Sequence, residues 1–166
     1  MKTHLKRIAG NALLNYDEME TLVTQIEAVL NSRPIVPLSA DSNDNASLTP
    51  AHFLIGDSLT APVEPTLLLT QMRQHFWKRW SNDYLNELQQ RTKWKTGGSS
   101  LKPGQLVIVR EDATPPLCWP LARVKETHPS SDGVVRSATI QTSKGLCKRP
   151  ATRLCPLPFD NENLGN

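Results

Sequence analysis

The spacing of the hydrophobic residues changes once along this chain, at the stretch KTGGSS (residues 95–100). Before this stretch, apolar residues recur every three or four positions, which is typical of one face of a helix. After it, apolar and polar residues alternate over short runs, which is typical of strands. Its Gly and Ser content marks the stretch itself as a linker. The sequence therefore predicts an α+β protein, in which a helical N-terminal segment precedes a small sheet.

The stretch NYDEMETLVTQIEAVLNSRP predicts the first long helix, and a shorter one, KTHLKRIAG, precedes it. Asn15 can cap the N-terminus, and Glu18 stands three residues on, as a capping box requires. Apolar residues recur at helical spacing between Met19 and Leu30, so this helix must bury one face. Pro34 ends it, because the residue before a proline is driven out of helical geometry.

The stretch LTPAHFLIG predicts a short third helix. Thr49 is a good cap, and Pro50 occupies the first helical position, where its missing N–H costs nothing. Gly56 can take the left-handed conformation that ends a helix. We expect this helix to fill an apolar gap. The preceding stretch, IVPLSADSNDNAS, is predicted to be a polar loop.

A longer helix is predicted over roughly residues 66–94, and it includes HFWKRWSNDYLNELQQRTKWK (75–95). Its apolar stripe steps by three or four residues through Leu69, Met72, Phe76, Trp80, Tyr84 and Leu88. Packing therefore explains most of the aromatic residues in this stretch. Trp94 is the exception, because it lies past the stripe and is flanked by two lysines.

Four or five short strands are predicted after the linker, in QLVIVRED, WPLARVKETH, GVVRSATIQTS and GLCKRPATRL. Gly133 and Gly145 can take positive φ in the turns between the last three. So few residues suit a small, bent SH3-like β-barrel better than a sandwich. The predicted segments are thus 1–65 (helical), 66–100 (connecting helix and linker), 101–158 (barrel) and 159–166 (disordered tail).

Charge is distributed unevenly along the chain. Residues 1–65 carry four Lys/Arg against eight Asp/Glu, a balance of −4, whereas residues 66–153 carry fifteen against six, a balance of +9. Such asymmetry indicates a polyanionic partner for the second segment, although a solvated basic surface would look the same. Basic side chains and aromatic rings on a small barrel can hold a phosphate backbone without reading its sequence. Trp119 and His128 could offer such planar faces.

The candidate nucleic-acid contacts are therefore basic residues of the second segment. In the long helix they are Lys78, Arg79, Arg91, Lys93 and Lys95. In the strand segment they are Arg123, Lys125, Arg136, Lys148 and Arg149, and Lys144 and Arg153 add to its basic character.

No set of residues indicates catalysis, so the chain is not expected to be an enzyme or to take a small-molecule substrate. The four histidines are scattered, and no phosphate-binding loop or nucleophile elbow is present. Asp41, Asn43 and Asn45 begin a calcium-loop pattern, but Ala46 replaces its glycine and His52 its closing glutamate. The three cysteines have no C-x-x-C spacing. We expect no metal or cofactor in this chain.

An intracellular protein, nuclear or cytoplasmic and not secreted, is the expectation. No apolar run approaches the roughly 20 residues that span a bilayer, and the basic N-terminus lacks the apolar stretch of a secretory signal.

The order of four blocks resembles the C-terminal part of the integrase in Bel/Pao-type LTR retrotransposon polyproteins of animals. These blocks are LLNYDEMETLVTQIEAVLNSRPIVPLS, LTPAHFLIGD, FWKRWSNDYLNELQQRTKW and the strand segment from LKPGQLVIVRED to KRPATRLCPLP. The resemblance covers roughly residues 1–158, and LTPAHFLIG is among its most specific parts. It implies the end of an RNase H-like core, then a connecting helix and an SH3-like barrel that helps to bind DNA.

The resemblance also implies what the chain lacks. In that family, two aspartates and a glutamate hold divalent metal ions, Mg²⁺ or Mn²⁺, for DNA strand transfer. Those residues would lie before Met1, so we expect a catalytically incomplete fragment associated with DNA integration. Lys2, Lys6 and Arg7 match the basic face that leads towards DNA in related integrases. Its partners would be DNA and either a second copy or the rest of the integrase polyprotein.

Two alternatives stay open at this point. The barrel could be an interaction module that binds a peptide or a chromatin protein. The chain could also be a degenerate transposon relic with no selected function. Salt dependence separates the first alternative from DNA binding, because only phosphate contacts weaken steeply as salt rises.

Overall fold

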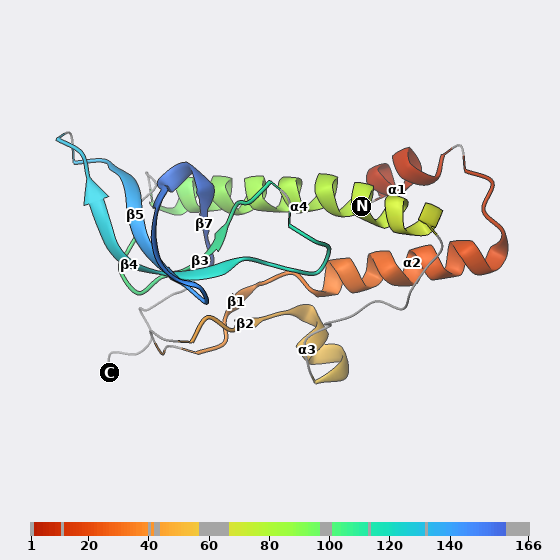
Figure 1. Cartoon of the computed structure of the whole chain (residues 1–166), viewed down its shortest axis with the longest axis horizontal. Coiled ribbons are helices and arrows are strands. Elements are labelled where there is room, and N and C mark those ends of the chain that lie inside the picture. The colour runs from red at the N-terminus through yellow and green to blue at the C-terminus, as the bar shows by residue number, and fades with distance from the viewer. Residues whose placement is uncertain are drawn as a thin grey trace. The chain divides into compact units, whose positions relative to one another are not determined.

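A computed structural model describes residues 2–10, 12–39, 41, 44–56, 67–96, 101–112, 114–131 and 133–158 (Figure 1). The described part contains both helices and an antiparallel sheet, which confirms the predicted α+β class. The chain divides into two compact units, each discontinuous in sequence. Unit 1 comprises Met1–Arg33, Thr49–Tyr84 and Pro115–Cys118, and unit 2 comprises Pro34–Leu48, Leu85–Thr114 and Trp119–Asn166. The predicted segments, by contrast, are continuous.

Unit 1 is helical. It contains α1 (Lys2–Ala9), α2 (Tyr16–Asn31), α3 (Pro50–Ile55) and the first part of α4 (Leu67–Thr96). The predicted capping box of α2 is present. The Asn15 side chain accepts a hydrogen bond from the Glu18 backbone N–H at 2.8 Å, and Glu18 Oε2 accepts one from the Asn15 N–H at 3.0 Å.

The predicted apolar face of α2 is only partly covered. Leu22, Ile26 and Val29 are buried, whereas Met19 and Val23 are exposed. Both exposed residues belong to the stripe predicted between Met19 and Leu30. The buried face of α2 is therefore narrower than the apolar stripe in its sequence.

Helix α3 has the predicted ends. Pro50 is its first residue, and Gly56 takes φ of 77° after its last. The backbone N–H of Thr49 donates to Nδ1 of His52 at 3.1 Å. The expectation that this helix fills an apolar gap is wrong, because its large side chains are exposed: Phe53 by 72%, Leu54 by 66% and Ile55 by 61%. Ala51 is the residue of this helix that is buried.

Helix α4 closely matches the predicted long helix of residues 66–94. In unit 1, its buried side chains are Leu69, Met72, Phe76 and Trp77. Phe76, Trp80 and Tyr84 stack in succession, with ring centroids 6.4 and 5.6 Å apart. His4 of α1 meets the edge of Phe76 and lies 3.0 Å from Oδ2 of Asp83. Packing thus accounts for these aromatic residues, as predicted. Trp94 and the linker residues 97–100 lie outside the described side chains.

Unit 2 is built around a sheet. Its strands are β3 (Leu106–Val109), β4 (Leu121–Pro129), β5 (Val135–Thr142), β6 (Gly145–Pro150) and β7 (Leu154–Pro156), and the turn η1 (Ala151–Arg153) joins the last two. In the described part of the chain the strand order is β6-β5-β4-β3-β7, antiparallel throughout. The predicted turn glycines, Gly133 and Gly145, have positive φ. The predicted tail, 159–166, lies outside the described residues.

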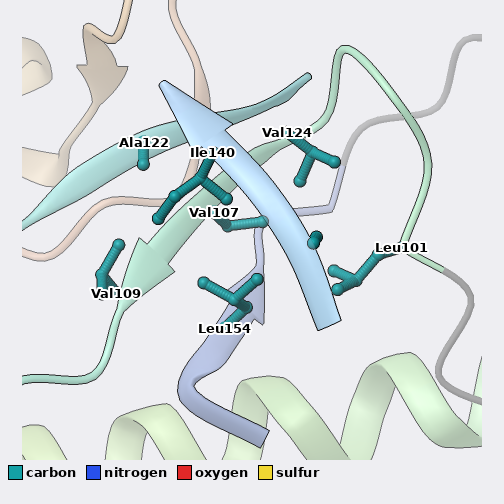
Figure 2. Packing of buried hydrophobic residues seen from close by; sticks show 8 residues of the cluster. Leu101, Val107, Val109, Ala122, Val124, Ile140 and Leu154 are labelled. Atoms are coloured by element: carbon teal, nitrogen blue, oxygen red, sulfur yellow. The ribbon is translucent and has the colours of Figure 1, made fainter. Parts of the chain in front are cut away.

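One face of the sheet forms a hydrophobic core (Figure 2). The core residues are Leu101, Val107, Val109, Ala122, Val124, Ala138, Ile140 and Leu154. Alternation along β5 places Ala138 and Ile140 in this core, so Thr139 between them faces the other way. Leu106 and Ile108 of β3 point to the opposite face and are fully buried as well, so both faces of β3 are covered.

The predicted polar loop before α3 contains a short hairpin. Its strands, β1 (Val36–Pro37) and β2 (Ser47–Leu48), pair antiparallel. The Ile35 N–H donates to the Leu48 carbonyl at 2.8 Å, and the Leu38 N–H donates to the Ala46 carbonyl at 3.0 Å. This hairpin belongs to unit 2, although unit 1 contains the residues on both sides of it in the sequence.

Candidate nucleic-acid interface

Exposed basic residues of unit 2 lie on strand β6 and on the next two strands of the sheet, β5 and β4. Lys148 and Arg149 are exposed on β6, which is the last strand at its end of the sheet. Lys148 pairs in register with Thr139, and Arg149 with Ala138. Lys144 is exposed in the turn before β6. All three bases are exposed. Lys148 and Arg149 point to opposite faces of the sheet, as do Thr139 and Ala138 with which they pair, so the bases can meet a ligand that lies along the β6 edge.

Two further exposed bases lie on the adjacent strands, Lys125 on β4 and Arg136 on β5. Neighbouring strands lie about 5 Å apart, so the bases of β4, β5 and β6 fall on strands that span about 10 Å. We call Lys125, Arg136, Lys144, Lys148 and Arg149 the basic strand surface. Glu126, exposed and in register with Thr139, is an acid among them.

Arg123 was predicted to contact nucleic acid, and the structure corrects this prediction. Its side chain is only 1% exposed. Its guanidinium donates hydrogen bonds to the backbone carbonyls of Gly104, Ser39 and Asp44, at 2.8, 3.2 and 2.6 Å. Because these carbonyls surround the guanidinium, a phosphate has no access to it.

Arg153 is also engaged, although it is exposed. Its Nη1 lies 3.0 Å from Oδ2 of Asp112, and it donates to both carboxylate oxygens. His128, proposed as a planar face, has its Nε2 within 2.8 Å of the Thr139 hydroxyl. Neither side chain is included in the basic strand surface.

The remaining candidates lie elsewhere in the chain. Lys6 and Arg7 of α1 and Lys78 and Arg79 of α4 are exposed in unit 1. The side chains of Lys2, Arg91, Lys93 and Lys95 lie outside the described part. The structure thus brings together four of the predicted contacts on one sheet, and they are Lys125, Arg136, Lys148 and Arg149.

No group of three or more His, Cys, Asp or Glu side chains among the described residues could hold a metal ion. Cys155 is fully buried in β7, and burial raises the pKa of its thiol to about 11. The charge of Arg110 and a hydrogen bond with Gln89 act in the opposite direction but do not offset burial. A thiol with so high a pKa is a poor nucleophile and metal ligand near neutral pH.

Comparison with known families identifies one match. Residues 66–157 match a family described as a family of unknown function, DUF5641. The chain belongs to the DUF5641 family. No curated protein and no solved structure matches it. The DUF5641 region takes in α4 and strands β3 to β7, and so the whole basic strand surface. It leaves out α1, α2, α3 and the β1–β2 hairpin.

Sequence reasoning missed two features of this DUF5641 protein. The first is the role of Arg123. Alternation along β4 places it opposite the core residues Ala122 and Val124, but alternation does not show which residues cover it. The second is the exposure of the α3 side chains, for which the sequence carries no signal.

In the part of the chain that the structure describes, no helix has the length and apolar character needed to cross a membrane.

Proposed function

We propose that this DUF5641 protein binds nucleic acid, and DNA in particular, through the basic strand surface. The observation that carries the proposal is the exposure of Lys125, Arg136, Lys144, Lys148 and Arg149 on three adjacent strands and their turn. Lysine and arginine bind a phosphate backbone by charge, and each phosphate contact releases condensed counterions. Such contacts position a protein on DNA and carry no base specificity.

The sheet of unit 2 is proposed to be an SH3-like barrel. Its strands are short, and β4 has two irregularities in its pairing with β5, between Val124 and Glu126 and between His128 and Pro129. Bulges of this kind increase the local twist and bend a sheet. The turn η1 carries the chain from β6, at one end of the strand order, to β7 at the other. These features support a small closed sheet.

The chain as a whole is proposed to be the C-terminal part of a retrotransposon integrase, without catalytic residues of its own. The succession of α3, α4 and the sheet supports this proposal, because it follows the order of the blocks on which the resemblance rests. The exposed side chains of unit 1 support it too. Phe53, Leu54 and Ile55 form a contiguous run of exposed apolar side chains on α3. Such exposure is expected if the rest of an integrase core covers them in the longer protein.

The proposal is tested by titrating random-sequence duplex DNA with the full chain at several salt concentrations. The double variant Lys148→Gln, Arg149→Gln should bind more weakly at low salt. Because two phosphate contacts are removed, the slope of log affinity against log salt should become shallower by about 2. Fluorescence anisotropy of labelled DNA measures both quantities.

The matched control is Lys148→Arg, Arg149→Lys, which keeps both charges and should retain the affinity and the slope. Absence of DNA binding in dilute buffer would contradict the proposal. Binding to a peptide or chromatin protein with little salt dependence would instead favour the interaction-module alternative. DNA cleavage or joining by the chain with Mg²⁺ would contradict the absence of catalysis.

A further inference from the structure

Arg123 is a buried cation whose hydrogen-bond acceptors, in the part of the chain that the structure describes, are backbone carbonyls. Nη1 donates to Gly104, and Nη2 donates to both Ser39 and Asp44. Its Nε is buried and has no hydrogen-bond partner among the described residues. Removing a guanidinium from water costs several kcal/mol, which is tolerated only where other groups satisfy its donors. The burial of Arg123 therefore depends on the three carbonyls that accept its hydrogen bonds.

Two of these carbonyls come from a distant part of the sequence. Ser39 and Asp44 lie in the β1–β2 hairpin, 84 and 79 residues before Arg123. Gly104 lies in the turn that leads into β3, where its φ is 84°. One side chain on β4 thus binds the hairpin and the entry to β3 together, within unit 2.

The hairpin has little support of its own. Within the described ranges 34–39, 41 and 44–48, its strands pair in register at two positions, Val36 with Leu48 and Pro37 with Ser47. Two-stranded hairpins are marginal in water even when they are longer. The hairpin therefore needs a partner, and Arg123 supplies two charge-assisted hydrogen bonds to the loop that joins its strands.

We infer that the β1–β2 hairpin, with its described residues 34–39, 41 and 44–48, is an integral part of the sheet unit and that Arg123 docks it there. The surface around Arg123 is thus an interaction surface whose partner is a segment of the same chain. The working module is then discontinuous, consisting of the hairpin and the strand segment, and the DUF5641 region contains only the second of these. The inference goes beyond the proposed function and does not depend on nucleic-acid binding.

Hydrogen exchange on the full chain tests this inference, with Arg123→Lys and Arg123→Met as variants. Lysine keeps the charge but has no planar fork with which to hold the three carbonyls. The amides of Ile35 and Leu38, which donate within the hairpin, should exchange about 10-fold faster or more in both variants. The amide of Leu157, which donates to the carbonyl of Leu106 in β3, should stay protected.

The control is Arg136→Lys, the same substitution at an exposed position on the neighbouring strand, which should leave every one of these amides unchanged. Unchanged exchange at Ile35 and Leu38 in both Arg123 variants would overturn the inference. Equal loss of protection throughout the sheet would also overturn it, because Arg123 would then support the core and not dock the hairpin.

A DNA titration of Arg123→Met separates docking from a phosphate contact. Docking predicts an unchanged salt slope, whereas loss of one phosphate contact makes the slope shallower by about 1. If the chain binds no DNA, the exchange measurement still decides the inference while the proposed function fails.

Discussion

Burial changes the chemistry of single side chains in this DUF5641 protein, and the thiol pKa of Cys155 is one example. The ordinary pKa of the thiol is 9.0, and its burial in β7 raises the pKa to about 11. Arg123 is a second example. Arginine usually lies on the surface, but here it is buried and hydrogen-bonds to the backbone of a distant segment. In both cases the residue type alone suggests a reactive or binding role, and the surroundings assign a structural one.

The first prediction concerns the pH dependence of stability. The folded thiol of Cys155 keeps its proton at a pH where the unfolded thiol loses it, so its contribution to stability is complete below about pH 9. That contribution is lost progressively as the pH rises from about 9 towards about 11. Urea unfolding of the parent and of Cys155→Ala at about pH 8 and about pH 10.5 should show a smaller alkaline loss in the variant.

The exposed Cys118 offers the control, because Cys118→Ala should keep the alkaline loss of the parent. If Cys155→Ala lost as much stability as the parent between the two pH values, Cys155 would not be the group that titrates.

At the scale of elements, local signals set where the helices begin and end. Asn15 and Glu18 satisfy each other's backbone N–H groups at the start of α2, and these donors have no partner within the helix. Gly56 ends α3 because a left-handed residue without a Cβ avoids strain. These features need only neighbouring residues, so they form wherever the sequence contains them.

The second prediction belongs to this scale. Replacing Asn15 with Ala should lower the free energy of unfolding of unit 1 by about 1 kcal/mol, because the Glu18 N–H loses its acceptor. Chemical denaturation followed by circular dichroism measures the change. Glu27→Ala, at an exposed position inside α2, is the control and should alter stability by less than about 0.5 kcal/mol. Equal effects from the two substitutions would show that the cap contributes nothing.

At the scale of the whole molecule, exposed apolar side chains and exposed bases occur on both units, with Leu146 exposed on β6 in unit 2 and Lys78 exposed on α4 in unit 1. The described residues of unit 1 expose large apolar side chains on α3 and at the start of α4, including Phe53, Ile55 and Leu67. Unit 2 carries the basic strand surface. Surfaces of the first kind commonly mark contacts with another polypeptide, whereas those of the second kind suit a polyanion.

The third prediction follows from the apolar surface. The double variant Phe53→Ser, Ile55→Ser should lower self-association and the binding of a hydrophobic dye, because both side chains are more than half exposed. Its melting temperature should stay close to that of the parent. Sedimentation velocity and dye fluorescence measure the first effects, and calorimetry measures the last.

Leu22→Ser is the contrasting variant, since Leu22 is fully buried in α2 and its loss should cost about 2–5 kcal/mol. A comparable loss of stability in the Phe53, Ile55 variant would mean that α3 packs through these side chains.

Features that depend on neighbouring residues in the chain can be predicted from the sequence. Periodicity identified α2, α4 and the strands, and turn glycines marked the hairpins, because each of these patterns repeats within a few residues. The sequence also separated the acidic segment from the basic one, since charge is a property of composition. Four of the predicted contacts accordingly lie together on the sheet.

Which face of each element is covered, and by which residues, depends on tertiary contacts. Alternation places Arg123 on the face of β4 opposite the core residues Ala122 and Val124, but a segment 79 to 84 residues away makes that position buried. Alternation likewise cannot tell that Phe53 stays exposed while Ala51 is buried. Burial arises from contacts between residues far apart in the sequence, and no local pattern specifies such contacts.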